Sequence, residues 1–535
     1  MADLIIINGR VWTGGPTPSH AQAIAIDGER IVAVGTNAAV ASLRTAATRV
    51  MDAAGRRVLP GFNDAHLHFM LGAASLTEVD LKDASNVAAM AARVGDRAAS
   101  SPGRWMRGGG WDEQRFAPPR LPSRHDIDPV SAGTPVFVHR YDLHTALVNS
   151  LVLRLAGIDA ATPDPRGGTI VRDERGEPTG VLKDAAIRLV ERVVPAPTFD
   201  ERVEVARRGL RHAAALGLTS VQDMNPADAD LDVYAFLAER GEMTLRLSAA
   251  MLEIPLAERV KAGTVRVLNG PYVKTGKAKG FADGSLGSTT ALFFEPYADA
   301  PDQYGLLSDQ MQPLEAMRER LRVLDAAGLQ LCIHAIGDRA VSLVLDLAAD
   351  LERSNGRRDR RFRIEHAQHV APADLDRFAA LGVVASVQPY HVIDDGRWAE
   401  ARLGLERVKT TFPFRSFLDR GVCVAIGTDW PVAPLDPRLT LYAAVTRAPV
   451  DGRHPGGWVP EQKIGLAEAI EGYTRTAAFA EFAEHEKGTI APGKLADLVV
   501  LGEDVFEVPA EAIRDVPVDG TIVGGRVVHV RGAGL

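Results

Sequence analysis

Residues 59–69 read LPGFNDAHLHF and carry two histidines, His66 and His68, one residue apart. An apolar lead-in with the turn-forming pair Pro60 and Gly61 precedes them. Alternate side chains of a β-strand share a face, so both imidazoles would point the same way, with their Cα atoms about 6.6 Å apart. That spacing lets both rings reach one metal ion, and neutral imidazole is a common zinc ligand. Two histidines on a solvated strand would look the same, so the other ligands have to come from the rest of the chain.

The chain of 535 residues is too long for one ordinary domain, and its composition is that of a globular enzyme. Hydrophobic residues make up 46% and charged residues 24% of it, and the net charge is −8 without a long basic run. This balance argues against a nucleic-acid partner and against anchoring on an anionic membrane. No apolar stretch approaches the roughly 18 residues of a transmembrane helix.

Two features bear on the compartment. The N-terminal segment has no basic region and no small-residue cleavage site, so we expect no signal peptide. The only two cysteines, Cys332 and Cys423, each lie inside an apolar run. A disulfide framework is thereby excluded, and a reducing cytoplasm is the simplest expectation.

The two ends of the chain resemble each other and differ from the middle. Residues 1–58 read as short β-branched strands separated by Asn-Gly and Asp-Gly turns, and residues 485–535 follow the same pattern. We therefore predict one small composite β-sandwich domain formed by residues 1–58 together with residues 485–535.

The middle of the chain, residues 59–484, repeats a unit of helix, glycine, five-residue apolar strand and polar residue. Four such units end at Asp223, His334, Gln388 and Asp429. Apolar strands joined through helices indicate a parallel sheet. Further strands are predicted at 245–251, 273–283 and 362–366 and, as the first, before His66, which makes eight.

Eight units of this kind favour a (β/α)8 barrel of the α/β class over an open doubly wound sheet. The first strand is also not followed by the Gly-x-Gly-x-x-Gly of a dinucleotide site. Residues from about 72 to 200 are rich in Gly and Pro breaks and do not keep the rhythm. We predict that they form an insertion after the first strand, which partly covers the site.

Polar residues close several of the predicted barrel strands, where barrel enzymes place their catalytic groups. They are His66, His68, Lys279, His334, His366 and Asp429. Zinc binds histidine and carboxylate, and a catalytic zinc site keeps one position open for water. Each residue has an ordinary structural explanation, but the whole set at strand ends favours a metal site.

Seven motifs along the chain together resemble the amidohydrolase superfamily, in the branch of the N-substituted formamide deformylases and YtcJ-like hydrolases. They span nearly the whole chain, in order: PGFNDAHLH at 60–68, GGWD at 109–112, KGFADGSLGS at 279–288, IHAIGDRA at 333–340, IEHAQ at 364–368, GTDWP at 427–431 and GTIAPGKLADL at 488–498. The resemblance implies the barrel with its composite β domain and a divalent metal, foremost Zn²⁺, with one or two ions per chain.

The resemblance also implies a role for each ligand. His66 and His68 would bind the more buried metal together with Asp429, and His334 and His366 would bind the second. Lys279 would bridge the two metals after carbamylation by CO2, although Lys274 and Lys277 lie nearby. The family often has a β-branched residue after this lysine, whereas Gly280 follows it here, a departure that concerns strand packing.

The expected reaction is hydrolysis of a C–N bond in an amide-type small molecule, such as an N-formyl or N-acyl amine. Metal-activated water would attack, with Asp429 as general base and then general acid. The residues expected near the substrate are Trp111, Asp112, His144, Gln388, Tyr390, His391 and Trp430. Asp223, at the end of the second strand, is expected to support the ligands from behind.

Several alternatives remain open from the sequence. A cyclic amide or imide hydrolase, an esterase or lactonase, and a deaminase would all use the same site. From a different class, the chain could be a non-catalytic binding protein with the same fold, although the intact ligand set speaks against it. The resemblance also allows a homodimer.

Overall fold

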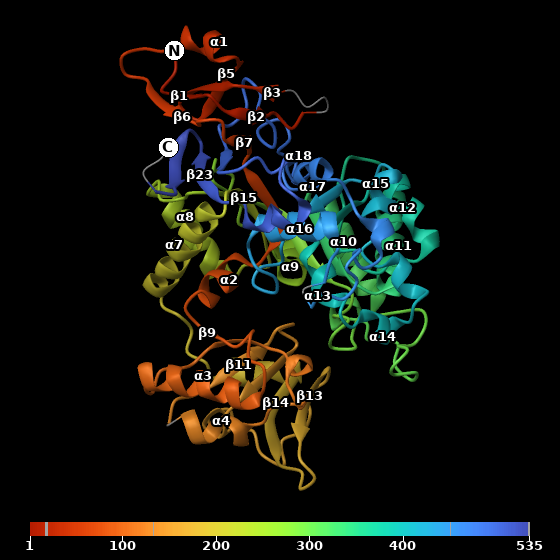
Figure 1. Cartoon of the computed structure of the whole chain (residues 1–535). Helices are drawn as coiled ribbons and strands as arrows, with labels where there is room; N and C mark the ends of the chain where they lie inside the picture. The colour runs from red at the N-terminus through yellow and green to blue at the C-terminus, as the bar shows by residue number, and fades with distance from the viewer. Residues whose placement is uncertain (16–19, 132, 450, 533–535) are drawn as a thin grey trace. The chain divides into compact units, whose positions relative to one another are not determined.

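The computed structural model describes residues 1–15, 20–131, 133–449 and 451–532 and divides into two compact units (Figure 1). The larger unit comprises Met1–Met70 and Val203–Leu535, and the smaller comprises Leu71–Arg202. That residues 72–200 partly cover the site stays a prediction.

The larger unit is built on an eight-stranded sheet in which hydrogen-bonded neighbours run parallel from β8 through to β21. Backbone N–H groups of Asp429 and His68 donate to the carbonyl oxygens of His66 (2.7 Å) and Trp430 (2.8 Å), which joins the first strand to the last. The sheet is a barrel, as the sequence predicts. Its strands are β8 (Phe62–Leu67), β15 (Leu218–Met224), β16 (Arg246–Leu252), β17 (Val273–Phe281), β18 (Gln330–Ala335), β19 (Arg363–His366), β20 (Val384–Val387) and β21 (Val424–Ile426).

Helices connect these strands and pack round the outside of the barrel (Figure 1). Before β15, β18, β20 and β21, a helix is followed by a glycine with positive φ, at Gly217, Gly328, Gly382 and Gly421. Glycine reverses the chain there because it accepts the left-handed conformation. The helices that precede these glycines are α7 (Phe199–Ala215), α10 (Leu314–Ala326), α12 (Leu375–Ala380) and α15 (Phe414–Asp419). Other helices of this unit are α2 (Phe69–Ser75), α8 (Asp228–Glu239), α9 (Glu253–Ala262), α11 (Asp338–Asn355), α13 (Tyr390–Asp395), α14 (Ala399–Leu403), α16 (Pro437–Thr446), α17 (Leu466–Gly472) and α18 (Arg475–Phe479).

Strands from both ends of the chain share one sheet, with the order β24-β23-β22-β7-β2-β3. A second sheet, β5-β4-β1-β6, comes from the N-terminal end alone, and apolar side chains of both sheets form one core. This is the expected composite β domain. Its strands are β1 (Leu4–Ile7), β2 (Arg10–Trp12), β3 (His20–Ala21), β4 (Ala23–Asp27), β5 (Arg30–Gly35), β6 (Arg49–Asp52), β7 (Arg57–Pro60), β22 (Leu498–Leu501), β23 (Val518–Val523) and β24 (Arg526–Val530).

A single residue, Gly61, separates the composite sheet from the barrel. β7 runs two residues past the boundary at 58, because Pro60 still pairs with Leu498. β8 begins at Phe62, and a Cβ at Gly61 would lie 2.1 Å from the side chain of Thr219. The chain passes between the two parts only because this position has no side chain.

The smaller unit has its own six-stranded sheet, with the order β13-β14-β12-β11-β10-β9, and two hydrophobic cores. From the sequence, we predict no strands in this segment. Part of the reason lies in β10, which reads GGGW and has positive φ at all three glycines. The elements are β9 (Val79–Asp80), α3 (Val87–Ser100), β10 (Gly108–Trp111), α4 (Arg124–Ser131), β11 (Phe137–Arg140), β12 (Thr145–Val148), α5 (Ser150–Leu155), β13 (Gly168–Arg172), β14 (Pro178–Asp184) and α6 (Ile187–Glu191).

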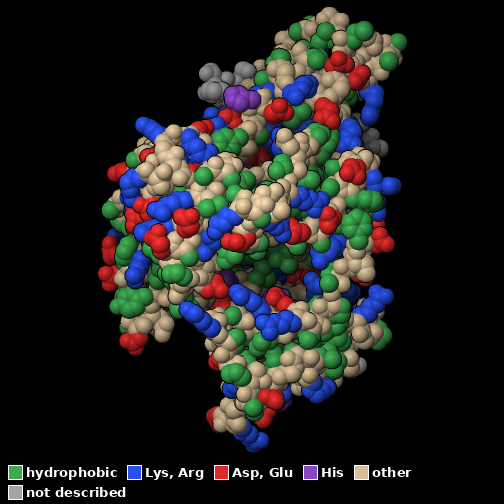
Figure 2. Space-filling view, turned by 180° about the vertical axis from the view of Figure 1, so that it is seen from behind, with side chains coloured by type: hydrophobic (Ala, Val, Ile, Leu, Met, Phe, Trp, Pro, Cys, Tyr) green, Lys and Arg blue, Asp and Glu red, His purple; other side chains and the backbone are tan. Residues whose placement is uncertain are grey.

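The surface of the protein carries charges of both signs. Basic and acidic side chains are interspersed over the face seen in Figure 2, so their fields largely cancel beyond a Debye length. Cys332 and Cys423 are both free, as the sequence predicts. Within the described ranges, no helix has the length and apolar character needed to cross a lipid bilayer.

Candidate metal centre

The six predicted ligands lie at or near the carboxyl ends of five barrel strands. His66 lies near the end of β8 and His68 directly follows it, and Lys279, His334 and His366 lie in the last three residues of β17, β18 and β19. Asp429 follows β21 by three residues. His366 and Asp429 have positive φ, of 74° and 63°, which is unusual for residues with a side chain. Strained backbone of this kind concentrates at functional sites.

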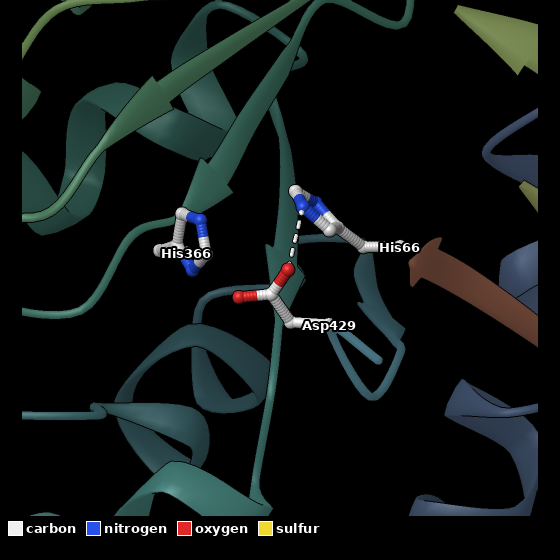
Figure 3. A group of neighbouring side chains, drawn as sticks. All are labelled: His66, His366 and Asp429. Carbon is white, nitrogen blue, oxygen red and sulfur yellow. Dashed lines mark ion pairs between the residues drawn. The ribbon is translucent and has the colours of Figure 1, made fainter. Parts of the chain in front are cut away.

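Three of these side chains point at a common centre (Figure 3). The potential ligand atoms of His66, His366 and Asp429 all lie within 4.8 Å of one another, and all three residues are buried. Asp429 Oδ1 lies 3.5 Å from His66 Nε2 and 3.2 Å from Nε2 of His68. The cluster thus offers at least two imidazoles and one carboxylate, a donor set that suits zinc and other divalent metals.

Four buried polar atoms at this centre lack a hydrogen-bond partner among the described residues. They are His66 Nε2, Lys279 Nζ, His366 Nδ1 and Asp429 Oδ1. A buried polar atom without a partner costs about 1–3 kcal/mol, so such a concentration calls for an explanation. A metal ion would satisfy the two imidazole nitrogens and the carboxylate oxygen, so His66, His366 and Asp429 fit the metal that the sequence predicts.

Hydrogen bonds fix the ring tautomers of the two histidines on β8. Nδ1 of His66 donates to Glu365 Oε2 at 2.6 Å, and Nδ1 of His68 donates to the carbonyl oxygen of Met224 at 2.8 Å. A carboxylate and a carbonyl only accept, so the proton sits on Nδ1 in both rings. Each ring then presents an Nε2 lone pair toward Asp429.

His334 lies beside this cluster, with its ring centroid 4.4 Å from that of His366. Its Nε2 donates to the carbonyl oxygen of Gly284 at 3.2 Å and lies 3.5 Å from Asp283 Oδ1. The carboxylate of Asp283 accepts backbone N–H bonds from Leu292, Ile336 and Gly337, each 3.0 Å or shorter. The DGSLG motif therefore holds the turn that follows His334.

The two lysines of β17 differ in what their amines contact. Lys277 Nζ donates to Gln222 at 2.7 Å and lies 3.9 Å from Glu481. Lys279 is fully buried, and its amine has no hydrogen-bond partner within the described part of the chain. Burial lowers the pKa of Lys279, because desolvation disfavours the charged ammonium. Gly280 stands where the family often has a β-branched residue. The reason is steric, since a Cβ at this position would lie 2.9 Å from Ile333.

The electrostatics of the cluster favour a neutral imidazole and a charged carboxylate. Burial, with the neighbouring His334, holds the pKa of His366 well below its usual range. Burial raises the pKa of Asp429, but the surrounding histidines outweigh it and hold that pKa well below its usual range. Metals bind the deprotonated forms of both residues, so both are in the form that a metal needs.

Asp429 faces a further histidine on its other side. Oδ2 of Asp429 lies 3.5 Å from Nε2 of His391, in the first turn of α13. The His391 side chain is 14% exposed. The carboxylate thus has one oxygen toward the histidines of β8 and the other toward a partly exposed imidazole.

The residues predicted to contact substrate fall in both units. Trp111, Asp112 and His144 belong to the smaller unit, where Trp111 is buried in the core and His144 Nδ1 lies 2.9 Å from Asp184. In the larger unit, Gln388 is buried, Tyr390 is half-buried, and Trp430 packs against Phe69 and His212. Substrate contact by these residues stays a prediction.

Three groups around the centre are invisible to sequence reasoning. Glu365 lies on the strand of His366 but binds His66, 299 residues away in the chain, and Arg363 on the same strand binds Glu365. Asp64 accepts hydrogen bonds from His66, Thr428 and Tyr473. For Glu365, the only signal is its place inside the IEHAQ motif. Asp223 binds the N–H of Phe69 at 2.9 Å and so fixes the turn after His68.

Comparison with known proteins agrees with this picture. A closed parallel barrel with imidazoles and a carboxylate converging at its strand ends is the architecture of a metal-dependent hydrolase. The family model described as Amidohydrolase family matches residues 49–529, and the chain belongs to that family.

The similarity to known relatives covers most or nearly all of the chain. Protein LONG AFTER FAR-RED 3 of Arabidopsis thaliana is 38% identical over 99% of this chain and 92% of its own. The putative amidohydrolase YtcJ of Bacillus subtilis is 31% identical over 89% of each chain. N-substituted formamide deformylase of Arthrobacter pascens is 29% identical over 99% of each chain. The YtcJ-like branch predicted from the motifs is thus confirmed.

A solved structure supports both the fold and the class. An uncharacterized metal-dependent hydrolase from Pyrococcus furiosus is 28% identical, with a TM-score of 0.76 over 94% of this chain and 99% of that one. The chain described here is accordingly a hydrolase with a His/Asp site for a metal.

Proposed function

We propose that this hydrolase cleaves the C–N bond of a small amide-type substrate, an N-formyl or N-acyl amine. The observation that carries the hydrolytic site is the set of four buried polar atoms at the barrel mouth that have no hydrogen-bond partner among the described residues. The choice of bond is supported by the likeness to N-substituted formamide deformylase over 99% of both chains. His66, His68, His334, His366 and Asp429 would hold the metal.

A divalent metal held by these residues, foremost Zn²⁺, would supply a nucleophilic hydroxide at neutral pH and would polarise the carbonyl of the substrate. Asp429 is charged in the folded protein and is therefore ready to accept the proton of the attacking water. It then returns that proton to the leaving amine nitrogen. His391, 3.5 Å from its second oxygen, holds the carboxylate from the open side.

We propose Lys279 as the site of carbamylation. Burial lowers the pKa of its amine and so makes the proton easier to lose, and the lone pair of the neutral nitrogen is the nucleophile toward CO2. A new N–C bond forms as one C–O π bond of CO2 breaks, one proton leaves the nitrogen, and the neutral amine becomes a carbamate whose single negative charge is shared by two oxygens. Such a group would allow two metals per chain. Lys277 is the weaker candidate because Gln222 already binds its amine.

We also propose that the partner of this enzyme is the small-molecule substrate, without nucleic acid or membrane, and that the enzyme works in the cytoplasm as a homodimer. The two free cysteines support the reducing compartment.

Elemental analysis and an activity panel test the proposal. The full chain is purified without chelator, its metal content is measured, and hydrolysis of N-formyl and N-acyl aryl amines is assayed beside cyclic imides, aryl esters and lactones. Two metals per chain with amide hydrolysis are expected. One metal with activity would leave Lys279 uncarbamylated, and activity confined to imides or esters would replace the substrate class. No metal and no activity after Zn²⁺ is restored would favour the non-catalytic binding protein.

A further inference from the structure

A fully buried carboxylate lies directly behind the predicted ligand His66. Glu365 precedes His366 on β19, and both its side chain and the carboxylate oxygens are enclosed in the barrel. Its Oε2 accepts the Nδ1–H of His66 at 2.6 Å, a short, charge-assisted bond. The ring atom that faces the metal centre is then Nε2, which has no hydrogen-bond partner among the described residues.

Arg363 holds Glu365 in place through a two-pronged contact. Its Nε donates to Oε1 at 2.8 Å, and its Nη2 donates to Oε2 at 3.0 Å. Nη2 also donates to Ser386 Oγ and to the carbonyl oxygen of Ala65, while Nη1 donates to Gln222. These partners lie on β8, β15 and β20, so the guanidinium is fixed by three strands besides its own. A planar fork with five donors suits this position, and lysine could not replace it.

The charge of the pair is also settled by its surroundings. The two-pronged contact with the Arg363 guanidinium and the short hydrogen bond from His66 Nδ1 both favour an ionised Glu365 carboxylate. An ionised carboxylate behind an imidazole makes the opposite ring nitrogen more basic. His68 differs, because its Nδ1 donates to a neutral backbone carbonyl.

We propose that Glu365, clamped by Arg363, is the positioning residue that orients His66 and raises its affinity for the metal. The inference rests on the proposed metal site and adds a residue to it that is not itself a ligand. It makes His66 and His68 unequal, with His66 the stronger donor of the two.

A second buried carboxylate provides a matched control. Glu481 is also enclosed, with its side chain 4% exposed, and it binds Lys487 and Asn63 at 2.8 Å. No contact joins Glu481 to a predicted ligand within the described residues. A Glu-to-Gln change at either position removes one buried charge and keeps the shape, so both changes should lower stability. Only the change at position 365 should alter the metal site.

The test is a zinc titration of the full-length chain after its metal has been stripped with a chelator. Zn²⁺ affinity is measured by competition with a chromophoric chelator for the wild type, E365Q and E481Q, together with the thermal midpoint of each stripped protein. We expect E365Q to raise the zinc Kd by about 10–100-fold, because loss of the group that orients a ligand has this effect. E481Q should stay within about threefold of the wild type.

Equal zinc affinity in E365Q and the wild type would overturn the proposal, as would equal weakening in E365Q and E481Q. If E365Q does not fold, the double variant R363M/E365L removes both charges together and avoids an unpaired buried ion. It should show the same loss of zinc affinity, and unchanged affinity would again overturn the proposal. Failure of the folded wild type to bind Zn²⁺ would instead count against the proposed function.

Discussion

At the scale of single residues, Asp429 connects two sets of partners. One carboxylate oxygen faces His66 and His68, and the other faces His391. A group in this position can both bind a metal and move a proton. Replacing it with asparagine keeps the shape and removes the basicity.

We predict that Asp429→Asn lowers kcat by about 10²–10⁴-fold, the range of a lost general base. The histidines remain, so part of the metal should stay bound. Steady-state kinetics and elemental analysis on the same preparation measure both effects. Near-normal turnover would remove Asp429 from the proton-transfer role.

Gln388 is the second residue with a testable polar atom. Its Nε2 donates to the carbonyl oxygen of Ser386 at 3.2 Å. This hydrogen bond identifies the nitrogen of the side-chain amide, so the remaining polar atom is the oxygen Oε1. That oxygen is buried and finds no donor in the part of the chain that the structure describes. Gln388 follows β20, at the same end of the barrel as the ligands. An N–H of an amide substrate would provide the missing donor.

Gln388→Leu should therefore lower kcat/KM for an N-formyl aryl amine by about 3–10-fold, the worth of one neutral hydrogen bond. The matching aryl ester has no N–H and should lose less. The ratio of the two kcat/KM values is the measurement. Equal losses on both substrates would show that Gln388 does not accept a hydrogen bond from the substrate N–H.

The candidate ligands could be predicted because they follow recognisable strands, whereas their supports could not. His334 and Asp429 each follow a helix, a glycine and an apolar run, so their place at the barrel mouth is local information. Glu365 and Arg363 instead read as ordinary charged residues. Their role exists only after β8 and β19 have been placed in one barrel.

At the scale of elements, Asp64 joins the first and last strands of the barrel. It accepts four hydrogen bonds: from the N–H of His66 at 3.1 Å, from the N–H and the hydroxyl of Thr428 at 3.0 and 2.7 Å, and from the hydroxyl of Tyr473 at 2.8 Å. This junction between the first and last strands, the barrel seam, also contains His66 and Asp429. Its geometry and that of the metal centre are therefore coupled.

We predict that Asp64→Ala costs about 3 kcal/mol or more, because it leaves several buried donors without an acceptor. Tyr473→Phe removes one of the four bonds and should cost about 1 kcal/mol. Urea unfolding gives both values, and metal content should fall with Asp64→Ala. Equal, small losses in the two variants would show that the seam does not depend on Asp64.

His369 lies in the connection after β19 and makes the fold sensitive to acid. It is buried, and its Nδ1 lies 2.8 Å from Thr411 Oγ1. Burial, with Arg407 nearby, lowers the pKa of His369 from 6.5 to about 3. The unfolded chain takes up this proton below pH 6.5 and the folded chain does not, so stability falls as the pH drops from about 6.5 toward 3.

Between pH 6.5 and pH 5, this one residue should cost about 2 kcal/mol of unfolding free energy. His369→Gln keeps a polar side chain without the titration, so its unfolding free energy should fall less over the same interval. Urea midpoints at both pH values measure the difference. Parallel pH profiles for the variant and the wild type would contradict the assignment.

Elements of the smaller unit were harder to predict than those of the barrel. β10 consists of three glycines and a tryptophan, and a Cβ at Gly109 would lie 2.0 Å from the carbonyl oxygen of His139. The neighbouring backbone lies so close that only glycine fits there. In a sequence, glycine indicates a break rather than a strand. The barrel strands instead carry continuous apolar runs, which are a direct signal.

At the scale of the whole molecule, strand β7 depends on strands from the far end of the chain. It pairs with β22, and Arg57 contacts Asp504, 447 residues away. All predicted ligands lie before residue 430. A chain that stops after Asp497 would keep every ligand but leave β7 and the core of the composite sheet uncovered.

We predict that this truncated chain loses cooperative unfolding and most of its zinc, although its ligand set is complete. Thermal unfolding followed by circular dichroism, with elemental analysis, measures both. A truncated chain with a sharp transition and full metal content would show that the barrel does not need the composite domain.

The pairing of β7 with β22 also sets an order of events during synthesis. The segment that leads into His66 is made before the barrel, but its partner strand β22 is made only after the last barrel strand. Until then, β7 has an open edge and an apolar face, the kind of surface on which nascent chains aggregate. The protein should therefore depend on chaperones until β22 has been made, and slower elongation would lengthen that exposure.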